Sequence, residues 1–349
     1  MSDSFPTIRV AAIQASPVFL DRERTAQKAC DLILEAGRNG AEYVVFPEGY
    51  IPAHPCWYHH HTATGSLANG LAIDLFKNAV TISGPAVTAL CAAAKKAGVF
   101  VVMGVCEKLA DTFGTMYNTQ VFISREGEFL GKHQKFMPTV GERLVHAGGH
   151  GDTFGTFKAH FGTVSALVCG ENTNPLAMFA LTSENTCIHG MSWPNYFALT
   201  APPMRNLVIP SSQAFAIISG AFVVSACGVI DEPMLDKMSV SSADREILAD
   251  PAYTGGSVII SSDGSILGEA ANNQEQILYA DCDFNITVRA KLRVDFAGHY
   301  NRPDIFQLRI NRSAPVACYP AKSGLQAALD GAAVANVPEA TETNQTDIV

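Results

Sequence analysis

Short apolar runs alternate with helical segments over the first hundred residues, and this order limits the fold more than any other feature. Three runs are apolar and β-branched, as buried strands are, and two segments between them carry apolar residues at helical spacing. In chain order these predicted strands and helices cover 8–14, 21–38, 43–46, 85–98 and 99–106. Strands that alternate with helices in this way predict an α/β fold, with sheets buried beneath layers of helices.

The rest of the chain continues the same pattern with more hairpins. Two strands flank Arg125-Glu126-Gly127, and two more flank Ser262-Asp263-Gly264, as short turns between paired strands do. The further predicted strands are 115–124, 128–134, 161–168, 188–193, 256–261, 265–269 and 276–281, and the further predicted helices are 174–185 and 211–226. No internal repeat divides the chain.

Two segments in the second half need a separate interpretation. The stretch Asn206–Ile230 has no charged residue and is long enough to cross a bilayer, but polar residues and glycines dilute it. We interpret it as a short strand followed by the buried helix 211–226. The polar stretch Asp231–Pro251 is predicted to be a long surface loop.

Composition excludes several classes of protein. The chain has 349 residues, 48% of them hydrophobic, which is ample for a large core and rules out a wholly disordered chain. Its formal net charge is −9, so it lacks the basic surface of a nucleic-acid-binding protein. The nine cysteines are scattered with no CxxC pair, and the N-terminus has no secretory apolar segment. We therefore expect a cytoplasmic protein with no nucleic-acid or membrane partner.

Three polar residues stand directly after apolar strands, where a rigid scaffold presents catalytic groups. Glu48 follows the strand 43–46, Lys135 ends the second hairpin strand, and Cys169 follows the strand 161–168. A nucleophilic thiol needs a base and a nearby positive charge, which Glu48 and Lys135 can supply. Gly170 would let a backbone N–H approach an anionic intermediate closely. Taken singly, each residue is more often structural or solvated.

The segments that contain these residues carry a resemblance to a known family. FPE at 46–48, GKHQKFMPT at 131–139 and LVCGEN at 167–172 resemble the three catalytic blocks of the nitrilase superfamily of carbon–nitrogen hydrolases, in the family's order. Glu142-Arg143, Ser192-Trp193-Pro194 and the segment 298–304 are similar to the nitrilase branch.

The resemblance implies a four-layer α-β-β-α sandwich over residues 6–310, followed by a C-terminal extension, 311–349, that is partly disordered or takes part in assembly. It implies that Cys169 attacks a nitrile carbon and that Glu48 moves the proton, for which its pKa should lie above that of a free glutamate. Lys135 would stabilise negative charge, and Glu142 would orient Lys135. The products would be a carboxylic acid and ammonia, with no metal or other cofactor.

Other implications of the resemblance are less specific. Tyr50, Trp57, Gly170 and Trp193 are candidate substrate contacts, and Gly170 stands where many nitrilases have Trp. Family members self-associate into dimers and larger spirals. An amidase or a cyanide-converting hydrolase would use the same residues, and a non-catalytic assembly or binding protein would keep only the scaffold.

A histidine-rich loop after Glu48 completes the candidates. His54, Cys56, His59, His60 and His61 fit no closed zinc pattern, so we expect a solvated or interface loop and no metal.

Overall fold

Two sheets lie face to face at the centre of the protein. The computed structural model describes residues 4–110, 112–197 and 201–314. The first sheet has the strand order β12-β1-β2-β3-β4-β5, and the second has the order β11-β10-β9-β8-β7-β6. The strands of the first sheet are β1 (Thr7–Gln14), β2 (Tyr43–Val45), β3 (Phe100–Lys108), β4 (Met116–Ile123), β5 (Phe129–Gln134) and β12 (Gln276–Asp283). The strands of the second are β6 (Phe157–Ala159), β7 (Gly162–Val168), β8 (Ile188–Trp193), β9 (Phe222–Cys227), β10 (Val258–Ile260) and β11 (Ile266–Glu269).

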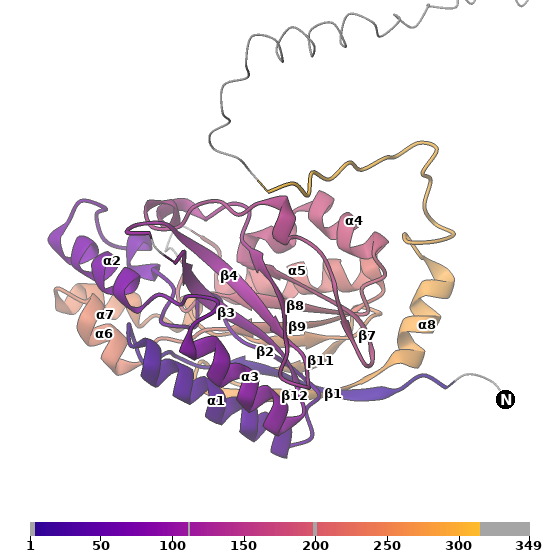
Figure 1. Cartoon of the computed structure of the whole chain (residues 1–349), viewed down its shortest axis with the longest axis horizontal. Helices are drawn as coiled ribbons and strands as arrows, with labels where there is room; N and C mark the ends of the chain where they lie inside the picture. The colour runs from indigo at the N-terminus through magenta and orange to yellow at the C-terminus, as the bar shows by residue number, and fades with distance from the viewer. Residues whose placement is uncertain (1–3, 111, 198–200, 315–349) are drawn as a thin grey trace, which may run out of the picture. The chain divides into compact units, whose positions relative to one another are not determined.

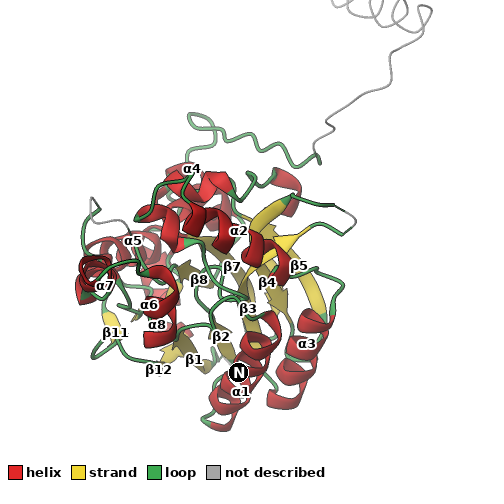
Figure 2. Cartoon of the chain, turned by 90° about the vertical axis from the view of Figure 1, so that its left-hand side faces the viewer, coloured by secondary structure: helices red, strands yellow, loops and turns green. Residues whose placement is uncertain are grey.

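Helices cover the outer face of each sheet. The helices are α1 (Arg22–Arg38), α2 (Ser66–Asn78), α3 (Pro85–Ala97), α4 (Pro175–Ser183), α5 (Met204–Ser219), α6 (Glu232–Met238), α7 (Ser242–Leu248) and α8 (Phe284–Arg293). Helices α1 and α3 lie side by side and pack on the first sheet, and α4 and α5 pack on the second (Figure 1; Figure 2). The predicted four-layer α-β-β-α sandwich is confirmed.

The core between the sheets explains why several central strands, such as β2, β3 and β9, are nearly continuous apolar runs. Val10, Val45 and Val102 of the first sheet meet Val164 and Ile188 of the second in one buried cluster. A strand covered on one face by its partner sheet and on the other by helices has no solvent-facing side, so the usual apolar–polar alternation disappears.

The uncharged stretch after Asn206 folds differently from our prediction. Helix α5 begins at Met204, contains Pro210 and ends at Ser219. The next residue, Gly220, caps the helix with a φ of 65°, a left-handed conformation that glycine adopts readily. Strand β9 follows, so the predicted order of strand and then helix was wrong. Among the described residues no helix is both long and apolar enough to cross a membrane.

The predicted surface loop Asp231–Pro251 was also wrong, because it contains α6 and α7. The Asp231 carboxylate accepts a hydrogen bond from the Met234 N–H, and the Ser241 hydroxyl accepts one from the Asp244 N–H, so each helix has an N-cap. Met234 and Met238 are buried one helical turn apart. The spacing of Met234 and Met238 is helical, but the polar composition of the stretch favoured a loop in the sequence analysis.

The boundary of the predicted extension stays a prediction. Contacts along the chain separate a compact unit that ends at Ser313 from a unit that begins at Ala314. The part of the extension from 315 to 349 lies outside the described residues.

Candidate active site

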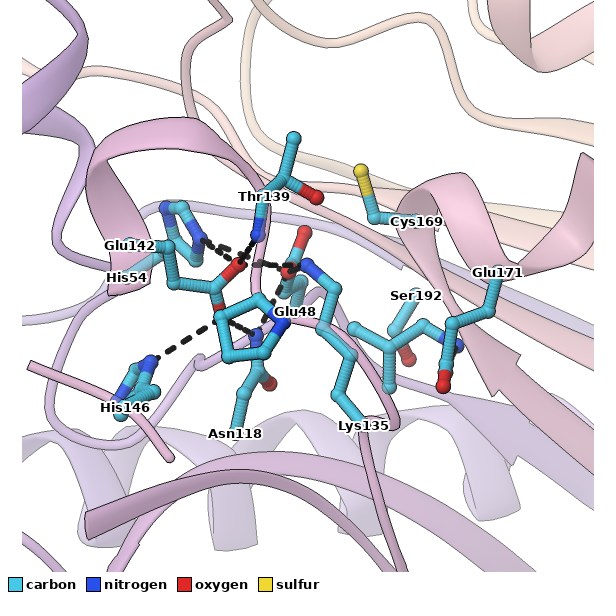
Figure 3. A network of polar contacts seen from close by, with 12 residues as sticks. Glu48, His54, Asn118, Lys135, Thr139, Glu142, His146, Cys169, Glu171 and Ser192 are labelled. Atoms are coloured by element: carbon cyan, nitrogen blue, oxygen red, sulfur yellow. Dashed lines mark hydrogen bonds and ion pairs between the residues drawn. The ribbon is translucent and has the colours of Figure 1, made fainter. Parts of the chain in front are cut away.

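The three predicted strand-end residues follow the carboxyl ends of β2, β5 and β7. Strand β2 is parallel to β3, and β5 runs in the same direction as β3 because two antiparallel pairings separate them. Glu48 and Lys135 therefore lie at the same edge of the first sheet. Cys169 leaves β7 of the second sheet toward the same place, as Figure 3 shows.

The turn that carries Glu48 crosses closely over β3. A side chain at Gly104 would place its Cβ only 2.0 Å from the Pro47 carbonyl oxygen, so this crossing requires glycine. The Glu48 N–H donates to the carbonyl oxygen of Trp193 at 3.0 Å, which ties the turn to the end of β8. The backbone of Glu48 is thus fixed between the two sheets.

Lys135 bridges two buried carboxylates. Its Nζ donates to Oε1 of Glu48 at 2.6 Å and to Oε2 of Glu142 at 2.7 Å, and all three side chains are at most 1% exposed. The Asn118 amide Nδ2 also reaches both carboxylates, at 2.7 and 2.6 Å. We call Glu48, Lys135, Glu142 and Asn118 the carboxylate–lysine cluster.

Local backbone structure holds Glu142 within this cluster. Thr139 caps the short 3-10 helix Val140–Leu144, and its N–H donates to Glu142 Oε2 at 2.8 Å. The ring nitrogen Nδ1 of His146 lies 3.1 Å from Glu142 Oε1. Both oxygens of Glu142 are therefore occupied by donors, which suits a residue that orients Lys135 rather than one that moves a proton.

Cys169 is held by its backbone. It has a φ of 51°, a left-handed conformation rare outside glycine, at the start of the 3-10 helix Cys169–Thr173. The Asn172 amide donates to the Cys169 carbonyl oxygen at 2.9 Å and braces this turn. The side chain is 2% exposed and lies beside Lys135 and Glu48 (Figure 3).

The pKa values of the charged groups follow from burial and from these contacts. Burial alone would raise the pKa of Glu48, but Lys135 and His54 outweigh it and leave the pKa below its usual value. Burial would also raise the pKa of Glu142, yet Lys135 and His146 lower it well below the usual value. Our expectation of a raised Glu48 pKa was wrong. Burial raises this pKa, but the nearby Lys135 ammonium and the His54 ring lower it by more.

The thiol and the ammonium are shifted in the opposite direction. Burial raises the pKa of Cys169 well above its usual value, the Glu48 carboxylate raises it further, and Lys135 offsets only part of this. Burial would lower the pKa of Lys135, but Glu48 and Glu142 raise it well above its usual value. At neutral pH the free site therefore holds a protonated thiol, an ammonium and two carboxylates.

The two oxygens of Glu48 differ in their surroundings. Oε1 accepts from both Lys135 and Asn118, whereas Oε2 is buried and has no hydrogen-bond partner among the described residues. A carboxylate oxygen with free lone pairs beside a thiol is placed to receive the thiol proton.

His54 belongs to the site, which the sequence did not predict. It is 2% exposed, and its Nε2 lies 3.5 Å from Glu48 Oε1 and 4.0 Å from Glu142 Oε2. The expectation of a solvated loop was therefore wrong for this residue. The spacing to Glu48 was visible, but only the fold shows that the loop returns to the carboxylates.

Glu48, His54 and Glu142 are close enough together to share a metal ion, because their ligand atoms lie within 4.8 Å of one another. The two carboxylates already bind a cation in the Lys135 ammonium. His60 and His61 face elsewhere, since His60 contacts Asp244 at 2.8 Å and His61 contacts the Met238 carbonyl at 2.6 Å. The His59 ring stacks on His54, with the ring centroids 6.1 Å apart.

The candidate substrate contacts separate into two groups. Trp193 packs in the same buried cluster as Cys169, and Gly170 is exposed, with no atom within 4 Å of the place its Cβ would take. Tyr50 is fully buried against Phe46 beneath the outer helices, and Trp57 packs against Phe19 in a separate core. The structure thus brings Trp193 and Gly170 together with Cys169 but not Tyr50 or Trp57.

Comparison with known proteins agrees with the sequence resemblance. A family profile described as carbon-nitrogen hydrolase matches residues 9–291. The aliphatic nitrilase of Rhodococcus rhodochrous is 33% identical over 87% of this chain and 79% of its own length. The bifunctional nitrilase/nitrile hydratase of Lupinus angustifolius is 35% identical over 88% of each chain.

A solved structure supports the fold independently. The carbon-nitrogen hydrolase from Helicobacter pylori superimposes with a TM-score of 0.67 at 18% identity, covering 86% of this chain and 96% of its own. The sandwich, the family profile and the sequence relatives therefore lead to one conclusion. This chain belongs to the carbon-nitrogen hydrolase family and is an enzyme of its nitrilase branch.

Proposed function

We propose that the protein hydrolyses an organic nitrile to the carboxylic acid and ammonia, through a covalent intermediate on Cys169. The observation that carries this proposal is the ammonium of Lys135 bridged between two buried carboxylates beside a thiol on a strained turn. The relatives named nitrilases support the choice of a nitrile.

The first step needs a base, because the pKa of Cys169 is raised and its thiol is protonated at neutral pH. As the sulfur forms its bond to the nitrile carbon, Glu48 Oε2 takes the thiol proton. One electron pair of the carbon–nitrogen triple bond moves to nitrogen, which Glu48 then protonates. The product is a neutral thioimidate, and Glu48 is again a carboxylate.

Two waters complete the reaction. Glu48 takes a proton from the first water as the water oxygen adds to the thioimidate carbon, and passes this proton to the nitrogen. The new hydroxyl group then gives its proton to the nitrogen through Glu48, so the carbon–nitrogen bond breaks, ammonia leaves and a thioester remains. The second water adds in the same way and releases the acid and the thiol. Lys135 stabilises the negative charge that develops in these steps, and Glu142 keeps Lys135 in place.

A second candidate is release of the amide, or action on amides or cyanide. The tetrahedral intermediate that forms after the first water adds can expel sulfur instead of ammonia. The same residues, Glu48, Lys135 and Cys169, would serve both reactions. The lupin relative named as both nitrilase and nitrile hydratase supports a shared site for the two outcomes. A shared Glu-Lys-Cys site likewise supports the amidase alternative.

The test is product analysis with a panel of aliphatic, aromatic and arylacetonitrile substrates and simple amides. Wild type should release ammonia with a matching amount of acid from at least one nitrile, and Cys169→Ala should release neither. Turnover of amides alone would favour the amidase alternative. Equal turnover by Cys169→Ala would rule out the covalent route.

Location and assembly are part of the proposal. We propose a reducing compartment, the cytoplasm, because the eight described cysteines are free thiols, and most of them are buried.

We also propose self-association, supported by the apolar side chains of Leu292 and Phe306, which are 74% and 70% exposed. Sedimentation velocity of the full chain measures the assembly, and a single species of monomer mass at working concentration would contradict it.

A further inference from the structure

Glu171 lies two residues after Cys169 and takes no part in the mechanism above, yet its carboxylate is buried between the segments that carry Lys135 and Cys169. We propose that Glu171 is a positioning residue that sets the distance between the Lys135 ammonium and the Cys169 sulfur. This inference rests on the proposed function, in which both groups act on one substrate.

Three donors converge on this carboxylate. Oε1 accepts from the Phe136 N–H at 2.5 Å, and Oε2 accepts from the Val168 N–H at 3.0 Å. The Nε2 atom of His133 lies 3.0 Å from Oε2, and the Glu171 side chain is 5% exposed. Two of the three donors are backbone amides, so the carboxylate fixes the path of the main chain itself.

The three donors lie next to Lys135 and Cys169 in the chain. His133 and Phe136 stand on either side of Lys135, at the end of β5 and just beyond it. Val168 immediately precedes Cys169 at the end of β7. One carboxylate therefore holds the Lys135 segment of the first sheet at two points and joins it to the nucleophile turn of the second.

The chemistry of the donor set requires a carboxylate. Three N–H groups point at two oxygens, which together offer about four lone-pair positions. Because a carboxylate oxygen accepts, the Nε2 atom of His133 is the donor in its contact with Glu171, and the Nδ1 atom has no hydrogen-bond partner among the described residues. An amide of the same shape has one accepting oxygen, and its NH₂ group would face a donor.

The catalytic consequence follows from the position of Lys135. Its ammonium must stabilise charge on the nitrogen or oxygen of the substrate carbon that is bonded to the Cys169 sulfur, so both groups must meet the substrate at once. A displacement of about 1 Å between reacting groups can lower a rate roughly 100-fold. Loss of the Glu171 contacts should therefore affect kcat more than KM.

The experiment compares Glu171→Gln with wild type and with a matched control, Glu107→Gln. Glu107 is similarly buried, at 3% side-chain exposure, but its carboxylate accepts from the side chains of Thr119, Lys132 and Gln134 and from no backbone N–H among the described residues. Each protein is assayed for nitrile kcat and KM. The rate of iodoacetamide labelling at Cys169 is followed by mass spectrometry from pH 6 to 9, and Tm is recorded.

For Glu171→Gln we expect kcat to fall about 10-fold or more while KM changes by less than about threefold, with a matching fall in Cys169 labelling. Glu107→Gln should keep kcat within about twofold, whatever its Tm. Glu171→Asp, which retains both accepting oxygens on a shorter arm, should lie between wild type and Glu171→Gln.

The inference is overturned if folded Glu171→Gln keeps kcat and labelling within about twofold of wild type, or if Glu107→Gln loses as much. Should Glu171→Gln fail to fold, Glu171→Asp decides, and wild-type kcat in that variant overturns the inference. Failure of the proposed function looks different, because wild-type Cys169 would then label no faster than the other cysteines and Cys169→Ala would keep its turnover.

Discussion

The two halves of the site are held in place by different means. On the first sheet, the carboxylate–lysine cluster is a network in which each side chain is fixed by its hydrogen bonds to the others. On the second sheet, Cys169 is fixed by its strained backbone and by the Asn172 amide on its carbonyl. We therefore expect substitutions in the cluster to lower both activity and stability, and substitution of Cys169 to lower activity while its backbone support is kept.

The charges explain this difference. A buried carboxylate that loses its cation destabilises the folded state strongly, so we expect the cluster to be stable only when all its members are present. A buried thiol carries no charge at neutral pH when its pKa is raised, as it is at Cys169. Substitutions in the two halves should therefore separate loss of activity from loss of stability.

The largest effect is expected from Lys135→Met, which leaves two buried carboxylates without their cation. We expect the free energy of unfolding to fall by about 3–5 kcal/mol and activity to fall about 1000-fold or more. Urea unfolding and a nitrile assay measure both. Lys28→Met is the control, because both side chains of its pair with Glu275 are partly exposed, at 27% and 47%, and losing this pair should cost about 1 kcal/mol. Similar losses in both variants would contradict the distinction.

The cluster should also make stability depend on acid. Lys135 holds the pKa of Glu48 and Glu142 below their usual values, so their contribution is complete above about pH 5 and is lost as pH falls through the lowered values. The raised pKa of Lys135 keeps its contribution intact up to about pH 10.

Thermal unfolding of wild type and Glu142→Gln between pH 7 and pH 3 tests this acid dependence. The variant lacks one of the titrating carboxylates, so the difference in Tm should be largest near pH 7 and should shrink as pH falls. A difference that stays constant or grows toward pH 3 would show that Glu142 is not ionised in the folded protein at neutral pH.

A smaller change in stability is expected from Cys169→Ala. Turnover should be lost, but the free energy of unfolding should change by less than about 1.5 kcal/mol, because alanine keeps the backbone turn and removes only one sulfur atom from the packing. Urea denaturation monitors this. A loss comparable to that of Lys135→Met would assign Cys169 to the structural core.

The smallest effect is expected from Gly170→Ala, next to the nucleophile. The added Cβ meets no atom within 4 Å, and Gly170 is not in a left-handed conformation, so Tm should stay within about 2 °C of wild type. A change in relative kcat/KM across nitriles of increasing size, with Tm retained, would place Gly170 at the substrate pocket. An unchanged ranking would place it outside.

Strand ends were the most reliable part of the sequence analysis. Glu48, Lys135 and Cys169 could be placed because an apolar run that stops at a polar residue marks the edge of a buried sheet. The order of α5 and β9 could not be predicted in this way. Pro210 disfavours a helix locally, and only the packing of α5 on the second sheet outweighs this preference.

The partners of the site residues were harder to predict than the residues themselves. Asn118 and Glu171 contact segments that are distant in the chain, and His54 reaches Glu48 only because its loop turns back. The segments of Asn118 and Glu171 show no period or spacing that relates them to Glu48 or Lys135, and the spacing of His54 to Glu48 does not show that the loop turns back toward the carboxylates. Side chains of this kind are recognisable only when the strands are aligned.

The sequence by itself determined the layered fold, the strand ends that carry Glu48, Lys135 and Cys169, and the family to which they belong. Apolar periodicity and strand boundaries are local properties, so they can be read along the chain. Only the tertiary structure decided the ionisation of the site, including the lowered pKa of Glu48. A pKa depends on the charges and donors within a few ångströms, and these come from residues far apart in sequence.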